Sequence, residues 1–203
     1  MVTRAGLRIL AAVNADFFTP EGSTVGSEVA AGRVTAARTR PAVAWRPGAD
    51  PWMGSTLVTG DTLWAGWPVP LGLGDGVTEL VGGYPELLAG GSRVGDLGVG
   101  ERPGFAASRH PRTAVGFDPA KGRLWLVVVD GRQPPYSVGM TLPELSDFLS
   151  ALGATEALNL DGGGSTVVVV GGKPRNRPSD QSGERPVVNA LALVRDPAFC
   201  RTR

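Results

Sequence analysis

A strand pattern, a helix pattern and a second strand pattern follow one another between residues 124 and 160. The first predicted strand covers 124–130, and its continuous apolar run LWLVVVD indicates burial on both faces. A helix is predicted over 141–152, because Thr141 and Glu144 form a capping box and leucines recur at helical spacing. A chain with this order of elements is expected to build at least part of its fold around a sheet with a helical crossover.

The second predicted strand, ALNL, covers 157–160 and completes a β-α-β unit. Such crossovers place their two strands parallel in one sheet, so Asp130 and Asp161 should meet at the same edge. Flanking hairpins, beginning with a strand over 113–117, extend the sheet. We therefore predict a single domain of the α+β or mixed α/β class over residues 1–203.

Three glycines follow Asp161 in the stretch LNLDGGGSTVVVV. A tight reversal needs only one or two residues with positive φ. The third glycine therefore indicates that the backbone comes close to another group. The alternative is an ordinary hairpin turn with a solvated aspartate.

Composition excludes several classes of protein. The net charge of +1 gives no footprint for nucleic acid, and one cysteine (Cys200) excludes a disulfide framework. One histidine, His110, excludes a multi-histidine metal site, and it is expected to anchor a loop by a hydrogen bond. No apolar stretch approaches a membrane span, and the N-terminus lacks the layout of a cleavable signal peptide.

Polar residues converge on the sheet edge that carries the two aspartates. Arg112 precedes the strand over 113–117, and Arg132 follows Asp130 by two residues. Arginine forks bind phosphate oxygens in a bidentate manner, and the glycine turn can offer backbone N–H groups. Two carboxylates beside arginines are what cleavage of a charged glycoside would need. The alternative, a set of solvated loop charges with structural ion pairs, carries equal weight on these observations.

The motifs together resemble the phosphodiester glycosidase family. They occur in the order of that family and span nearly the whole chain, and the set is more specific than any one of its members. The matching segments are VNADFF (13–18), VGGYPELLAGG (81–91), RHPRTAVGFD (109–118), LVVVDGRQ (126–133), YSVGMTLPELSDFL (136–149), ALNLDGGGST (157–166) and GERPVVNALAL (183–193).

The resemblance implies hydrolysis of a sugar-1-phosphodiester, with an N-acetylglucosamine-type sugar expected, to a free sugar and a phosphomonoester. It also implies an extracellular or cell-envelope location and more chain before Asn14 than the 13 residues present, so we expect a shortened form or a fragment. Asp161, Asp130, Arg112 and Arg132 are the expected catalytic residues. The expected substrate-binding residues are Asn14, Asp16, Asn159, Gly162, Gly163, Ser165 and Arg185.

In the expected mechanism, the arginines hold the phosphate and Asp161 acts at the anomeric carbon, with Asp130 as its partner. Phe17 or Tyr136 could stack on the sugar. No cofactor or metal is required; the alternative is a divalent cation at the edge of Asp130 and Asp161. The partner is a small or polymeric glycosyl phosphodiester, and no oligomeric state is predicted.

Two alternatives to the enzyme remain. One is a non-catalytic module that binds glycans or phosphoglycans on the same fold, which could dispense with the two carboxylates. The other, a nucleotide-binding α/β protein, is disfavoured because DGGGST matches no phosphate-loop pattern and leads into a strand.

Overall fold

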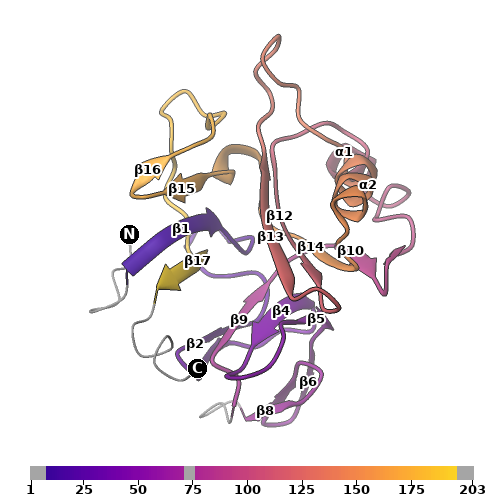
Figure 1. The fold of residues 1–203 in the computed structure, drawn as a ribbon, viewed down its shortest axis with the longest axis vertical. Helices are drawn as coiled ribbons and strands as arrows, with labels where there is room; N and C mark the ends of the chain where they lie inside the picture. Colours follow the sequence, from indigo (N-terminus) through magenta and orange to yellow (C-terminus); the bar gives the residue numbers. More distant parts are fainter. Residues whose placement is uncertain (1–7, 71–75, 196–203) are drawn as a thin grey trace.

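The computed structural model describes residues 8–70 and 76–195, so Cys200 lies outside the described residues. Most of the regular structure in these two ranges is β-strand (Figure 1), which shifts the predicted mixed class toward β. The strands form two five-stranded sheets, one four-stranded sheet and one three-stranded sheet within these ranges. The helical segments that the structure describes are α1 (Pro103–Ala106), α2 (Leu142–Leu152) and the 3₁₀ turn η1 (Gly163–Ser165).

One five-stranded sheet, here called the central sheet, has the strand order β11-β10-β14-β12-β13. Both β13 and β14 run antiparallel to β12. The two strands of the predicted β-α-β unit therefore share a sheet and a direction, but β12 separates them, so they are not a hydrogen-bonded parallel pair. The strands are β10 (Glu86–Ala89), β11 (Ser92–Arg93), β12 (Arg112–Asp118), β13 (Arg123–Val129) and β14 (Glu156–Asn159).

The prediction that the apolar run of β13 is buried on both faces is wrong. β13 is an edge strand, and Leu124 is 40% exposed. The strand buried along its whole length is β12, which lies between two neighbours. Its burial follows from its place in the sheet, because its own sequence, RTAVGFD, is less apolar than that of β13.

The helix prediction is confirmed in its boundaries. The Thr141 hydroxyl accepts a hydrogen bond from the backbone N–H of Glu144, whose carboxylate accepts one from the backbone N–H of Thr141. Gly153 ends the helix in the left-handed conformation, with φ of 97°. Leucines of α2 form a core with β10, β12 and β14, whereas Phe148 and Leu152 at the edge of the predicted stripe are exposed.

A second five-stranded sheet, with the order β3-β2-β9-β4-β5, packs against a small sheet of β6, β7 and β8. Their shared core contains Val29, Ala44, Leu63 and Val69. The strands are β2 (Glu28–Ala30), β3 (Arg33–Ala36), β4 (Pro41–Trp45), β5 (Trp52–Ser55), β6 (Leu57–Thr59), β7 (Thr62–Trp64), β8 (Pro68–Pro70) and β9 (Glu79–Gly82).

The four-stranded sheet has the order β16-β15-β1-β17. In Figure 1, this sheet lies on one side of β12 and β13, and the two helices lie on the other. A third core, which includes Ala15, Val81, Val115 and Leu158, joins residues from or beside all three larger sheets. The strands are β1 (Arg8–Asn14), β15 (Val168–Val170), β16 (Lys173–Pro174) and β17 (Ala190–Arg195).

Candidate active site

A pocket of about 590 Å³ lies where β12 begins and β14 ends. Its size is in the range of small-molecule sites. One carboxylate, three arginines, an imidazole and three phenylalanines contribute to its wall. The lining residues are Phe17, Phe18, Pro20, Gly104, Phe105, His110, Pro111, Arg112, Arg132, Asp161, Gly162, Gly163, Gly164, Ser165 and Arg185.

The glycine turn is a crossover between sheets and not a hairpin, because β14 belongs to the central sheet and β15 to the sheet of β1. Each of the three positions requires glycine for a different reason. A Cβ at Gly162 would lie 2.6 Å from the carbonyl oxygen of Pro111, and Gly163 has φ of +60°. A Cβ at Gly164 would overlap the Arg185 and Asp180 side chains. The expected close approach of the backbone to other groups is therefore present.

Asp161 stands at the start of this turn and lines the pocket. Its backbone N–H donates to the carbonyl of Ala15 at 2.8 Å, and its Oδ1 accepts from the N–H of Gly162 at 2.9 Å. Burial raises the pKa of Asp161, against the lowering effects of a Ser165 side-chain hydrogen bond, the Gly162 N–H and the charge of Arg185. The effect of burial on the pKa of Asp161 therefore outweighs that of the Arg185 charge.

Asp16 is a second buried carboxylate near Asp161 in the fold. Its Oδ2 accepts a 2.7 Å hydrogen bond from the N–H of Gly26, and a Cβ at Gly26 or at Gly82 would lie 2.8 Å from the same oxygen. Its Oδ1 is buried without a hydrogen-bond partner in the described part of the chain. Burial raises the pKa of Asp16 to about 6, opposed by the Gly26 N–H and the charge of Arg40, while the charge of Asp161 raises it further.

The raised pKa of Asp16 predicts a pH dependence of stability. Between the unfolded pKa of 3.8 and the folded value of about 6, the native state binds a proton that the unfolded state has lost. The contribution of Asp16 to stability therefore falls as pH rises through this window, by about 3 kcal/mol at 1.36 kcal/mol per pKa unit. Asp16→Asn should lack this fall. Urea unfolding at pH 4 and pH 7 tests it, and identical pH profiles for the two proteins would contradict it.

Arg112, at the start of β12, is 2% exposed. Its Nε donates to the carbonyl of Met140 at 2.9 Å, and its Nη2 donates to the carbonyls of Phe105 and Ser108 at 2.7 and 3.0 Å. Burial, with a smaller effect from the charge of Arg132, lowers the pKa of Arg112 to about 10. Much of its hydrogen-bonding capacity therefore serves backbone carbonyls of the segments before β12 and before α2, and the residue still lines the pocket.

Arg132 lines the pocket from the loop after β13. Its Nη2 lies 3.2 Å from Nδ1 of His110, whose Nε2 lies 2.9 Å from the carbonyl oxygen of Gly104. Because a carbonyl can only accept, Nε2 of His110 donates and Nδ1 accepts from Arg132. His110 thus makes the predicted loop-anchoring bond and also orients an arginine in the pocket wall.

Asp130 does not line this pocket. Its carboxylate accepts hydrogen bonds from the Tyr136 hydroxyl, from Nδ2 of Asn176 and from the backbone N–H of Arg177. Asp130 and Asp161 were expected at one edge of the sheet and in one site, but Asp161 lines the pocket without Asp130. Both oxygens of Asp130 are directed at loop partners, two of which lie far along the chain.

Two predicted substrate-binding asparagines are buried among protein partners. Asn14 donates to the carbonyl of Asp161 at 2.6 Å and accepts from Thr113 and from the backbone of Val167. Asn159 donates to the carbonyl of Tyr84 at 2.7 Å. Each is 1% exposed, so both hold the strands around the site and neither is among the pocket-lining residues.

The remaining predicted residues, Gly162, Gly163, Ser165 and Arg185, line the pocket together with Asp161. Arg185 is committed to an ion pair with Asp180, in which Nε donates to Oδ2 at 2.7 Å. Its side chain is 41% exposed, so it forms the outer wall. Residue by residue, the function of each remains a prediction.

The sequence-based site missed Phe105, which contacts Phe17 edge-on with ring centroids 6.0 Å apart. Tyr84 stacks on Phe105, and the Arg40 guanidinium lies over both Phe17 and Tyr84. The sequence feature that could have identified Phe105 as a site residue is its position in the long, turn-rich segment before Arg112. Phe17 was a stacking candidate and does line the pocket, whereas Tyr136, the other candidate, contacts Asp130 outside it.

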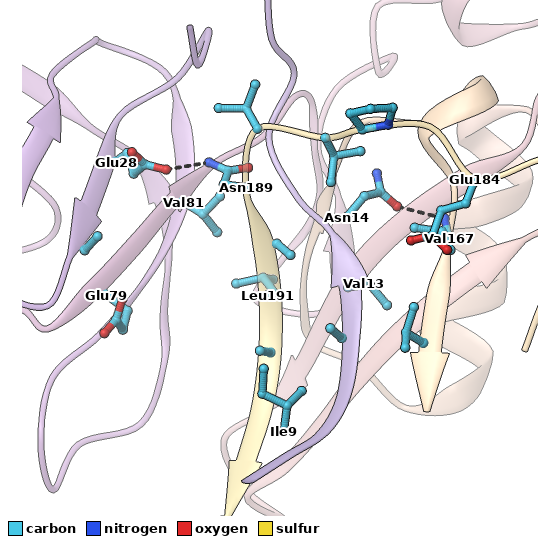
Figure 2. A pocket seen from close by; sticks show the side chains of 18 of the residues that line it. Ile9, Val13, Asn14, Glu28, Glu79, Val81, Val167, Glu184, Asn189 and Leu191 are labelled. Carbon is cyan, nitrogen blue, oxygen red and sulfur yellow. Dashed lines mark hydrogen bonds between the residues drawn. The ribbon is translucent and has the colours of Figure 1, made fainter. Parts of the chain in front are cut away.

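A second cavity, of about 680 Å³, lies between the sheet of β1 and the sheet of β9. Figure 2 shows Val13 and Leu191 on one side of it and Val81 and Glu79 on the other. A hydrogen bond of 2.8 Å from Asn189 to Glu28 crosses between the two sheets. Arg185 borders both this cavity and the pocket of Asp161, whereas Asn14 borders this cavity alone and Asp161 does not border it.

Within the described ranges, no three side chains of histidine, cysteine, aspartate or glutamate gather as metal ligands. None of the described helices is long and apolar enough to cross a membrane. The expectation that no cofactor is needed stays a prediction.

Comparisons with known proteins place the chain in a family. A model of the phosphodiester glycosidase family matches residues 8–194. Over 69 residues, which are 34% of its length, this chain is 45% identical to the bovine N-acetylglucosamine-1-phosphodiester alpha-N-acetylglucosaminidase and 42% identical to the human one. These matches cover 12% and 13% of the relatives, so the chain spans about an eighth of their length.

Solved structures show the same fold. The catalytic domain of the zebrafish enzyme, described as auto-inhibited by its pro-peptide, aligns with a TM-score of 0.68 at 24% identity, over 92% of this chain and 62% of that one. A putative exported protein from Burkholderia pseudomallei aligns with a TM-score of 0.70 at 22% identity, over 91% and 65%. With the family match over nearly its whole length, the chain belongs to the phosphodiester glycosidase family.

Proposed function

We propose that the chain hydrolyses a glycosyl phosphodiester, with an N-acetylglucosamine-type sugar, to the free sugar and a phosphomonoester. The observation that carries this proposal is that Asp161 lines one pocket together with Arg112 and Arg132. A phosphodiester needs positive charge beside it, and the anomeric carbon needs a carboxylate. The named activity of the bovine and human relatives supports the same chemistry.

Asp161 is the one carboxylate among the described residues that line this pocket. A single pocket carboxylate suffices here, because a phosphomonoester leaves with little need of protonation by a general acid. In the proposed step, the bond between the anomeric carbon and the phosphate oxygen breaks, and its electron pair stays on the phosphate beside the arginines. Asp161 acts as the nucleophile, or as the base that takes a proton from the attacking water.

Phe17 and Phe105 offer an aromatic surface for one face of a sugar ring. The backbone N–H groups of the glycine turn add donors for phosphate or hydroxyl oxygens. No cofactor is proposed, and an extracellular or cell-envelope location agrees with the exported protein among the structural neighbours. A non-catalytic glycan-binding module is the second candidate, but a buried carboxylate in the pocket wall favours the enzyme.

The test is hydrolysis of the methyl diester of N-acetylglucosamine 1-phosphate, measured as release of the free sugar. Arg132→Ala should lower kcat/KM by about 10²–10³-fold, the usual loss when a group that stabilises developing charge is removed. Arg132→Lys should restore only part, since the bidentate fork is lost. Arg123→Ala, on the exposed beginning of β13, is the matched control and should leave turnover unchanged. Binding of the diester without turnover would favour the glycan-binding module.

A further inference from the structure

Arg132 has a backbone conformation that L-residues rarely adopt. Its φ is +57°. Among the described residues that line the pocket, Arg132 is the one non-glycine residue with a positive φ. Such strain persists only where the surrounding structure enforces it, and it is concentrated at functional sites. Something must therefore hold the loop after β13 in place.

The carboxylate of Asp130, two residues earlier, is the centre of that support. Its Oδ1 accepts from Nδ2 of Asn176 at 2.9 Å, and both of its oxygens accept from the N–H of Arg177 at 3.1 Å. The Tyr136 hydroxyl donates to Oδ2 at 2.9 Å. Nε2 of Gln133 donates to the carbonyl of Arg177 at 2.8 Å, on the other side of Arg132. We call this set of bonds the Asp130 clamp.

The clamp is anchored in the segment that follows the glycine turn. Nδ2 of Asn176 also donates to the carbonyl of Thr166 at 3.1 Å, and Oδ1 of Asn176 accepts from the N–H of Val168 at 2.9 Å. The loop that carries Arg132 is thus connected to the chain that carries Asp161. Arg132 approaches that turn directly, because a Cβ on Gly163 would lie 3.1 Å from its Nη1.

The base of the loop rests on the backbone before β12. A Cβ at Gly131 would lie 2.7 Å from the nitrogen of Pro111, and one at Gly139 would overlap the backbone of His110. Hydrogen bonds in both directions join His110 and Met140. These contacts with residues 110–111 bring Arg132 close to His110, while the Asp130 clamp ties the same loop to residues 176–177.

We propose that Asp130 is a positioning residue for Arg132. Its carboxylate joins the 130–137 loop to residues 176–177, which keeps Arg132 in its left-handed conformation with the guanidinium in the pocket wall. The effect on catalysis rests on the proposed function, whereas the effect on geometry does not. A direct catalytic role for Asp130 does not fit a carboxylate whose two oxygens both accept hydrogen bonds from loop groups.

The geometric test uses His110, the single histidine of the chain. Its imidazole gives one set of signals in a long-range ¹H–¹⁵N spectrum, and these signals should shift when Arg132 leaves its Nδ1. Arg132→Ala sets the reference shift. Asp130→Asn and Asn176→Ala should each move the His110 signals in the same direction, and Arg123→Ala should leave them in place. Unmoved signals in both clamp variants would overturn the proposal.

The kinetic test uses the same variants with the methyl diester of N-acetylglucosamine 1-phosphate. Asp130→Asn and Asn176→Ala should each lower kcat/KM about tenfold, and the double variant should lose little more than either, because both remove one unit. A loss above about a hundredfold in Asp130→Asn, with normal activity in Asn176→Ala and an unmoved His110 signal, would make Asp130 catalytic instead. Moved signals without turnover in the wild-type protein would leave the positioning role standing and reject the proposed function.

A milder variant covers the case in which Asp130→Asn does not fold. Tyr136→Phe removes one hydrogen bond from the clamp and leaves an exposed ring otherwise intact. Its His110 signals should move in the same direction by a smaller amount. A folded Tyr136→Phe protein with unmoved signals and unchanged kcat/KM would count against the clamp.

Discussion

Asp161→Asn is expected to lower turnover of a glycosyl phosphodiester by about 10²–10⁴-fold, the range typical for a residue that transfers a proton or attacks in the transition state. The substitution preserves size and removes the charge. The fold should be unharmed, because asparagine can still accept the hydrogen bond that Gly162 donates to Oδ1. Burial raises the pKa of Asp161, which means that the fold disfavours the charged carboxylate. Removing the charge should therefore not lower the stability of the folded protein at neutral pH.

Turnover and the free energy of unfolding must be measured on the same preparation. Asp118→Asn is the matched control, because Asp118 is also a buried aspartate but sits at the far end of β12, beside Lys121. It should keep wild-type turnover. Near-normal activity in Asp161→Asn would show that the carboxylate serves only the glycine turn, and the proposed mechanism would fail.

Gly139→Ala is expected to destabilise the protein by about 3 kcal/mol or more, among the larger effects of a single substitution. Two penalties add at this position. The residue has φ of +93°, and a Cβ there would overlap the backbone of His110, which cannot move like a flexible side chain. Since the loop after β13 rests on this contact, turnover should fall together with stability.

Gly153→Ala separates the two penalties. Gly153 ends α2 with nearly the same φ, +97°, and a Cβ at this position would meet no other part of the described chain within 4 Å. The variant should therefore show only the left-handed penalty of about 1–2 kcal/mol. Both variants can be compared by urea unfolding. Equal losses of unfolding free energy in the two proteins would mean that the close approach of residue 139 to the His110 backbone does not contribute to the destabilisation.

Local patterns were predictable from the sequence. The capping box of Thr141 and Glu144 and the stop at Gly153 depend on groups within a few residues, so the bounds of α2 were predicted almost to the residue. The hairpin of β12 and β13 was predicted for the same reason. Asp161 was selected because it ends a predicted strand at the sheet edge and precedes three glycines that indicate a close backbone approach, and it does line the pocket.

Asp130 and Asp16 show where such reasoning stops. Both follow an apolar run, as Asp161 does, and the sequence offers no means to distinguish a pocket wall from a loop contact. The Asp130 carboxylate is bound by residues 46 and 47 positions later. The burial of Asp16 depends on two glycines, Gly26 and Gly82, that are 56 residues apart and meet over its oxygen.

The sequence alone determined the helix, its caps, the hairpin before it and the turn that presents Asp161, because each depends on hydrogen bonds and backbone preferences among near neighbours. Only the tertiary structure decided that β12 separates β13 from β14, that β13 is an edge strand, and that Asp130 binds a loop. The physical reason is that apolar runs and carboxylates specify the kind of partner they need. Which partner they meet depends on how distant segments pack.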